Sequence, residues 1–137
     1  MKVDSLVRFG VAVPGNLLLS FDERIEASGL PNRSEALRQL IREYVSQDVW
    51  EQGTGLVYGT ITITYNHHAH DAGARMTELQ HDFGDAIVCT THVHADHDHC
   101  IEVIIVRGEV PRVRGLIESL RSLKAITTLV PVIASLI

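Results

Sequence analysis

The feature that most constrains this chain is a single strand pattern near its start that has no partner strand beside it. Residues 7–13 alternate, with Val7, Phe9, Val11 and Val13 on one face and Arg8, Gly10 and Ala12 on the other. Two helical patterns follow, one from Asn16 to Gly29 and the next from Asn32. A lone strand leaves its backbone donors and acceptors unpaired, so we expect an antiparallel ribbon with the same strand of a second chain.

The second helical pattern opens with a capping signal. Asn32 suits the N-cap position, and Glu35 follows three residues later as in a capping box. The strand-helix-helix order, with Asn32-Arg33-Ser34-Glu35-Ala36 at this helix start, resembles the ribbon-helix-helix family of DNA-binding proteins. The resemblance implies two sets of DNA contacts, Arg8, Gly10 and Ala12 in the major groove and Asn32 and Arg33 where the helix start faces a phosphate. A dimerisation module without DNA binding is the alternative.

Charge gives no general support for a nucleic-acid partner. The 137 residues carry a formal net charge of −5. Residues 1–50 hold 6 Lys/Arg against 7 Asp/Glu, net −1, and residues 51–137 hold 6 against 10, net −4. Any DNA contact must therefore come from a local patch. Gly53 and Gly55 indicate a hinge, so we divide the chain into a DNA-binding and dimerisation domain (1–50), a hinge (51–58) and a metal-binding and tetramerisation domain (59–137).

The second part alternates strand and helix patterns. Strands are expected at 59–65, 86–94, 100–107 and 126–133, with helices near 72–83 and 111–123. The order βαββαβ is that of a ferredoxin-like domain of the ACT type, and the whole chain is α+β. The apolar run Ile126–Ile137 is too short to span a bilayer and is interrupted by Pro131, so we expect a final strand and no membrane partner.

Metal-ligand residue types crowd into residues 92–100. Strand alternation places His92 and His94 on one face, and a polar turn at 95–99 would bring Cys100 back beside them. All eight histidines lie between His67 and His99, and His81, at the end of a predicted helix, is the candidate fourth ligand. The remaining histidines have no defined role. A loop site that binds metal loosely is one interpretation of His67, His68 and His70. His97 and His99 are expected to be exposed at the surface or to form a weaker secondary site.

Three imidazoles and a thiolate suit Ni(II), Cu or Zn(II). Cys89 and Cys100, with no secretory segment before them, favour free thiols in a reducing cytoplasm over a disulfide. Four protein ligands close a metal site, whereas a catalytic zinc site keeps an open position. The pattern therefore argues against an enzyme.

Three short motifs carry a closer resemblance. Gln80-His81, His92-Val93-His94 and Cys100-Ile101-Glu102 are similar to those of the NikR family of nickel-responsive transcriptional regulators, over roughly Val7 to Lys124. The resemblance implies one Ni(II) per subunit, held in a square-planar site by His92, His94 and Cys100 with His81 of a neighbouring subunit. It also implies a cytoplasmic homotetramer, a dimer of dimers, that binds two half-sites of a double-stranded operator and represses nickel-uptake genes, with no small-molecule substrate.

Some positions depart from the family pattern. Family ribbons present Arg and two hydroxyl residues, whereas this chain has Arg8, Gly10 and Ala12. A second cation site would keep Glu35 but has Gln39 in place of its other carboxylate, so it would be weak. The alternative functions are a metal-binding or buffering protein whose ribbon only dimerises, and an amino-acid-sensing ACT regulator.

Overall fold

The computed structural model describes residues 5–69 and 71–135. The chain separates into two compact units between Ile41 and Arg42. Two helices come first, and a four-stranded antiparallel sheet with two helices follows, which confirms the α+β class. In the part that the structure describes, no helix combines the length and apolarity needed to cross a bilayer.

Two of the predicted helix signals are confirmed, the end of the first helix and the start of the second, whereas α1 begins at Gly15 after Pro14 and not with Asn16 as its cap. Helix α1 (Gly15–Ser28) ends at Gly29, whose φ of 73° is the left-handed conformation that glycine adopts without strain. Helix α2 (Arg33–Gln52) starts after Asn32, whose Oδ1 accepts the Glu35 amide at 2.9 Å. Asn32 is therefore the N-cap, as predicted.

The strand predicted at 7–13 is not formed within the single chain. Residues 6–14 lie in neither helix nor strand, and Phe9 and Val11 are 65% and 60% exposed. A strand needs a second backbone to satisfy its hydrogen bonds, and the described part of this chain supplies none here. The ribbon between two chains stays a prediction.

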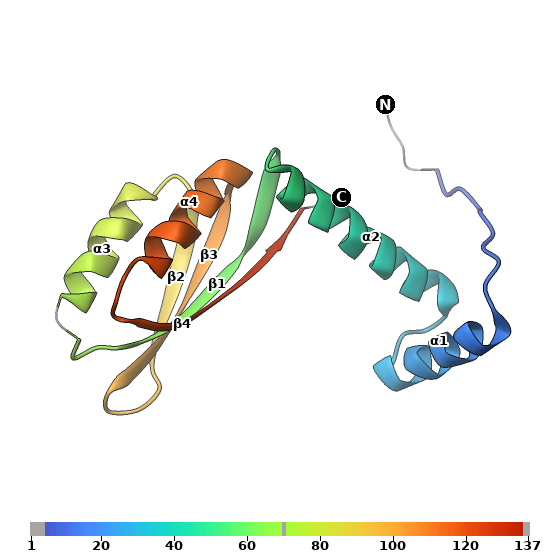
Figure 1. The fold of residues 1–137 in the computed structure, drawn as a ribbon, viewed down its shortest axis with the longest axis horizontal. Coiled ribbons are helices and arrows are strands. Elements are labelled where there is room, and N and C mark those ends of the chain that lie inside the picture. Colours follow the sequence, from blue (N-terminus) through green and yellow to red (C-terminus); the bar gives the residue numbers. More distant parts are fainter. Residues whose placement is uncertain (1–4, 70, 136–137) are drawn as a thin grey trace. The chain divides into compact units, whose positions relative to one another are not determined.

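From Leu56 onward the second unit has the predicted βαββαβ order. Its elements are β1 (Leu56–Asn66), α3 (Ala72–Asp82), β2 (Ile87–His94), β3 (His99–Glu109), α4 (Val110–Arg121) and β4 (Ile126–Ala134). The sheet order is β2-β3-β1-β4, with every neighbouring pair antiparallel. Helices α3 and α4 lie side by side on one face of this sheet (Figure 1).

The core lies between this sheet and its two helices. Ile61, Ile63 and Ile104 are fully buried on the strands, and Leu116 and Leu120 are fully buried on α4. The opposite face keeps apolar side chains at the surface, among them Val88, Val93, Ile101, Ile105, Val130 and Val132. An uncovered apolar face of this kind is typical of a sheet that packs against another subunit.

The connection into the sheet differs from the predicted pattern. Helix α2 continues to Gln52, and the chain then turns through Gly53 and Gly55, with φ of 75° and 106°. Strand β1 starts at Leu56, three residues before the predicted start, because Leu56, Val57 and Tyr58 pair with β3. The division at 1–50, 51–58 and 59–137 stays a prediction.

Candidate metal centre

The hairpin of β2 and β3 brings three of the predicted ligand residues together. His94 lies opposite Cys100 in the pairing of the two strands, and His92 lies opposite Glu102. The Sγ atom of Cys100, which is fully buried, is 3.4 Å from Nδ1 of His94. The ring centroids of His92 and His94 are 5.1 Å apart. A thiol and two imidazoles therefore share one end of the hairpin.

A hydrogen-bonded group orients His92. Its Nδ1 lies 3.2 Å from the Tyr65 hydroxyl and 3.5 Å from Oε2 of Glu102. Glu102 is only 4% exposed, accepts a hydrogen bond from the Tyr65 hydroxyl at 3.2 Å and another from the Gln80 amide. With Nδ1 turned towards this group, Nε2 of His92 is the nitrogen available to a metal.

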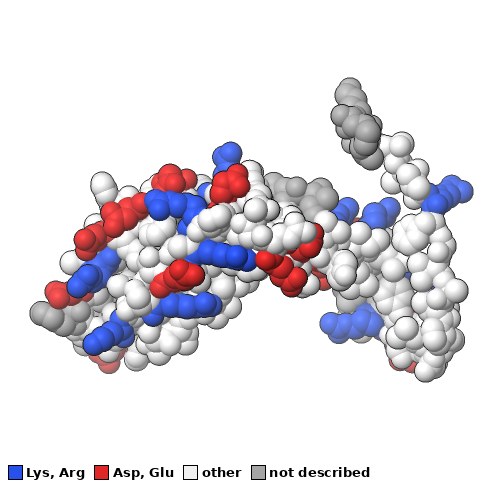
Figure 2. Space-filling model, turned by 45° about the horizontal axis from the view of Figure 1, so that its top comes forward, with Lys and Arg blue, Asp and Glu red and all other residues white. Residues whose placement is uncertain are grey.

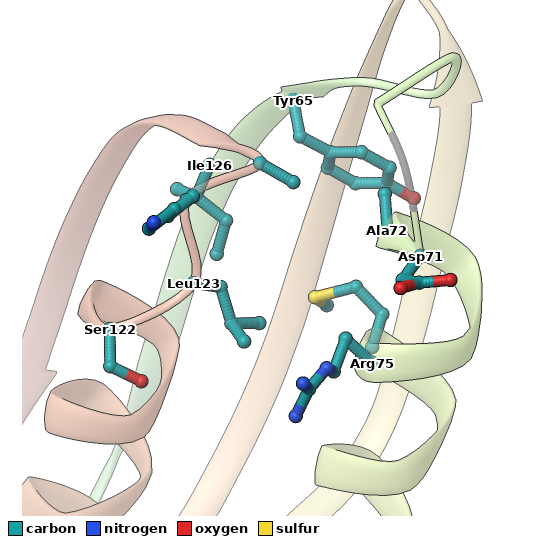
Figure 3. Close-up of a pocket in the computed structure, with 10 residues that line it drawn as sticks. Tyr65, Asp71, Ala72, Arg75, Ser122, Leu123 and Ile126 are labelled. Carbon is teal, nitrogen blue, oxygen red and sulfur yellow. The ribbon is translucent and has the colours of Figure 1, made fainter.

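Tyr65 contacts His92 and Glu102 through its hydroxyl group and lines a pocket with its ring. Its ring comes from β1 and lies against the start of α3, where it lines a pocket together with Asp71, Arg75 and Leu123 (Figure 3). Burial, followed by the nearby charge of Glu102, raises the pKa of Tyr65 to about 12. The phenol therefore stays protonated at neutral pH and can keep donating to Glu102.

His67 is the residue whose place the sequence analysis missed. One donor atom from each of His67, His94 and Cys100 lies within 4.8 Å of the others. Nδ1 of His67 is buried and has no hydrogen-bond partner among the residues that the structure describes. Burial, helped by the neighbouring His68, lowers the pKa of His67 and favours the neutral ring, the form that binds metals. An unsatisfied buried nitrogen beside a thiol and an imidazole fits a transition-metal ion.

The pairing of β1 with β3 explains why His67 reaches the hairpin. Asn66 pairs with His99, and the His67 amide donates to the Asp98 carbonyl at 3.0 Å. These contacts hold the loop after β1 beside the turn between β2 and β3, although the two segments are far apart in the sequence. The only sequence signal for this contact is the His-rich loop at the end of a predicted strand, and that signal does not say which histidine faces the thiol.

His81 lies apart from these donors. It is exposed in the last turn of α3 and shares the outer surface of the helix with Ala74, Thr77 and Glu78. Its neighbour Gln80 points the other way, to Glu102. In this chain His81 belongs to neither of the close groups of metal-ligand residues that the described residues form.

The other histidines that the structure describes, His68, His97 and His99, lie near the turn between β2 and β3. His99 Nδ1 is 2.9 Å from Oδ1 of Asp96, while His68 and His97 both approach Asp98. His70 lies outside the described residues.

The residues predicted to face DNA are exposed, and some already have partners. Arg8, Gly10 and Ala12 are exposed outside any element. Arg33 forms two hydrogen bonds of 2.7 Å with Asp22, which lower the pKa of that carboxyl group. Glu35 pairs with Arg38 at 2.6 Å.

The surface carries charges of both signs. On the visible face of the C-terminal unit, basic and acidic side chains are interspersed (Figure 2). On this face the described residues form no single-sign stripe of the kind that attracts nucleic acid.

Comparison with known proteins gives this architecture its family. Residues 7–48 match the ribbon-helix-helix proteins of the copG family, and residues 58–133 match the NikR C-terminal nickel-binding domain. The chain belongs to the NikR family. Its relatives are named as regulators, a class without enzymes. A ribbon-helix-helix DNA-binding domain is thus joined to a NikR nickel-binding domain, as the resemblance implied.

Several relatives match over most of their length. Candidate nickel-responsive regulators of Thermococcus onnurineus and Pyrococcus horikoshii are 47% and 44% identical over 121 residues, 88% of this chain and 88% of each relative. One of Chlorobaculum tepidum is 46% identical over 88% of this chain and 90% of its own. An uncharacterized Thermotoga maritima protein of known structure, 16% identical, covers 57% of this chain and 99% of its own with a TM-score of 0.50. It supports the fold alone.

Proposed function

We propose that this NikR-family chain is a nickel-dependent transcriptional repressor, with nickel-uptake genes as its targets. The observation that carries the proposal is the approach of the buried Cys100 thiol to His94 at 3.4 Å, beside His92, in a chain that also has a ribbon-helix-helix domain. A sensor needs both a selective metal site and a DNA-binding module, and this chain combines the two.

The proposed ligands are His92 through Nε2, His94 through Nδ1 and Cys100 through Sγ, with His81 of a neighbouring subunit as the fourth. The turn of His92 Nδ1 towards Tyr65 and Glu102 supports its use of Nε2. The outward position of His81 on α3 supports its donation to another chain. One Ni(II) would be held per subunit, and its bonds would join two chains.

Exposed apolar side chains in both units support the assembly of this chain with other copies of itself. In the first unit Phe9, Val11, Leu17 and Leu40 are all at least half exposed, which suits burial against a second copy. In the second unit the uncovered face of the sheet suits another pairing. Two kinds of contact produce a dimer of dimers, a homotetramer that can hold two half-sites of one double-stranded operator.

The link from metal to DNA is a shift in population. A site shared between chains is complete only in one assembly, so metal bound there favours that assembly. If the favoured assembly sets the two ribbon-helix-helix pairs at the spacing of the half-sites, the second contact is intramolecular and binding gains avidity. A free thiol ligand and a DNA target both fit the cytoplasm.

A gel-shift titration tests this function. The full chain is incubated with DNA selected from a random pool, with and without Ni(II). We expect Ni(II) to tighten specific binding by about tenfold or more, a coupling of about 1.4 kcal/mol. Cys100→Ser should lose this gain, and Cys89→Ser, which alters the other, exposed thiol, should keep it. Equal binding with and without Ni(II) in the selected pool would show that the chain is not a nickel-dependent repressor.

A metal buffer whose ribbon only dimerises is the second candidate. It is favoured by the pairing of Arg33 with Asp22 and by the absence of hydrogen-bonding side chains at Gly10 and Ala12. This candidate predicts metal binding without any sequence-specific complex. A complex whose affinity depends steeply on salt and on DNA sequence excludes it.

A further inference from the structure

A cavity of about 400 Å³ lies between the start of α3 and the loop that follows α4 (Figure 3). Its inner wall is apolar, because Met76 is only 5% exposed and Leu123 and Ile126 are half-buried. None of the four proposed nickel ligands is among the described residues that line it. Its volume is in the range of sites that bind small molecules, so the cavity is a candidate site apart from the metal centre.

Two basic side chains from different elements stand at the mouth of this cavity. Arg75 belongs to α3, Lys124 belongs to the loop after α4, and both are exposed. The Arg75 side chain extends from α3 towards Leu123 (Figure 3). Among the described residues, neither the Arg75 guanidinium nor the Lys124 ammonium has a hydrogen-bond or ion-pair partner. Two like charges that share one cavity repel each other, and an anion bound there offsets that repulsion.

The charge of the lining differs in sign from that of the chain. Arg75, Lys124 and the carboxylate of Asp71 give the described lining a net charge of +1. The whole chain has a formal net charge of −5. The cavity is therefore a place where an otherwise acidic chain attracts an anion.

We propose that this cavity binds a small organic carboxylate, with its charged group at Arg75 and Lys124 and its apolar body against Met76, Leu123 and Ile126. A guanidinium can donate two parallel hydrogen bonds to a carboxylate, and an ammonium adds a further charged donor. The apolar wall adds affinity in proportion to the apolar surface that it removes from water. A bare anion would use only the basic side chains and a neutral apolar molecule only the wall. The lining thus favours a ligand that has both parts.

This site does not rest on the proposed function, since neither nickel nor DNA enters the argument. The two sites share one side chain: the Tyr65 ring lines the cavity, while its hydroxyl contacts His92 and Glu102. The test is therefore made without added metal, so that a carboxylate that binds nickel cannot be mistaken for one that binds the cavity.

Nuclear magnetic resonance of the full chain, labelled with carbon-13 in its methionine methyl groups, tests the proposal. The chain has 2 methionines, and Met76→Leu identifies the signal that comes from the cavity. The probes are sodium benzoate, phenylacetate and isovalerate, with benzyl alcohol as an uncharged counterpart and inorganic phosphate as a bare anion. We expect at least one carboxylate to shift the Met76 signal to saturation, with a dissociation constant below about 10 mM. Benzyl alcohol and phosphate should bind at least about tenfold more weakly.

Substitutions at the mouth of the cavity separate a specific site from a general effect of charge. Arg75→Gln and Lys124→Gln should each weaken the best carboxylate by about tenfold. Arg121→Gln is the matched control, because it removes the same charge from the last turn of α4, outside the described lining. It should change the affinity by less than about twofold. All three side chains are exposed, so their replacement should preserve the fold.

Three results would overturn the proposal. The first is that none of the three carboxylates saturates the Met76 signal up to about 10 mM. The second is that benzyl alcohol or phosphate binds as tightly as the best carboxylate. The third is that Arg75→Gln changes the affinity no more than Arg121→Gln does. None of these results bears on the gel-shift test of the proposed function, which uses Ni(II) and DNA without any carboxylate.

Discussion

At the scale of single residues, the thiol of Cys100 decides the chemistry of the candidate metal centre that it forms with His92 and His94. It is fully buried among imidazoles, while Cys89 lies exposed on β2. The two cysteines of this chain thus provide a test and its control in the same strand pair.

Replacing Cys100 by Ser should abolish the near-ultraviolet absorption that a thiolate bound to Ni(II) produces, because a hydroxyl is a poor ligand for this borderline-soft ion. The same spectrum should persist in Cys89→Ser. Absorption spectroscopy during Ni(II) addition measures both. A band that survives in Cys100→Ser and vanishes in Cys89→Ser would move the site to the other cysteine.

Tyr65 gives the metal-free protein a distinct response to alkaline pH. Its pKa rises from 10.0 in the unfolded chain to about 12 in the folded one, first through burial and then through Glu102. Between these values the unfolded chain loses the phenolic proton while the folded chain keeps it. The contribution of Tyr65 to the free energy of unfolding is therefore fully present below about pH 10 and is lost as the pH rises towards about 12.

The urea midpoint of unfolding measures this loss. It should fall more between about pH 9 and about pH 11.5 in the parent chain than in Tyr65→Phe, which has no phenol to ionise at this position. The comparison concerns the change with pH, since Tyr65→Phe also loses the hydrogen bond to Glu102 at every pH. Tyr58→Phe, on the same strand, is the control and should keep the parent's steeper fall.

At the scale of elements, the close approach of β1 and β4 depends on Gly59. A Cβ atom there would collide with the Val132 carbonyl oxygen and lie 2.8 Å from Cδ1 of Ile133. Gly73, at the start of α3, has nothing within 4 Å of its place for a Cβ. One glycine is therefore required by packing and the other is not.

Gly59→Ala should lower the free energy of unfolding by about 1–3 kcal/mol, because the two strands must move apart. Gly73→Ala should leave it unchanged or raise it by about 0.4–1 kcal/mol, since alanine restricts the unfolded chain and favours a helix. Urea unfolding of both variants provides the measurement. Equal stability of Gly59→Ala and the parent would show that the strands have room for a methyl group.

The order of the elements could be predicted because periodicity and caps are local signals. Gly29 and Asn32 each act within a few residues, and both lie where the pattern placed them. The strand at 7–13 could not be confirmed in one chain, because its hydrogen bonds need a second backbone.

The candidate site was predictable only in part, because some of its contacts join segments that are far apart in the sequence. His92, His94 and Cys100 lie within one hairpin, whose alternation and short turn determine their faces. His67 reaches the thiol through the pairing of β1 with β3, and Tyr65 and Gln80 reach Glu102 from other elements. Contacts between distant segments depend on register, which a linear pattern does not specify.

At the scale of the whole molecule, His81 tests whether metal joins subunits. In the proposed assembly it donates across an interface, so His81→Ala should weaken Ni(II) binding by about tenfold and reduce the stabilisation by nickel by about 1.4 kcal/mol. Fold and metal-free stability should change little, because the side chain is exposed. Thermal unfolding with and without Ni(II), together with sedimentation, measures these effects.

Glu78→Ala is the matched control, since Glu78 lies on the same outer surface of α3. It should keep the full nickel response. If His81→Ala also kept it, the metal would be held by one chain, and His67 would be the remaining candidate for a further ligand.

The unpartnered segment before α1 has a consequence for genetics. Because residues 6–14 have no strand partner within the described part of the chain, the proposed DNA-contacting surface would be a property of pairs. A defective allele made in equal amount beside the normal one would leave only about a quarter of randomly formed pairs wholly normal. Substitutions at Arg8 that spare pairing should therefore behave as dominant-negative alleles, whereas substitutions that prevent pairing should be recessive.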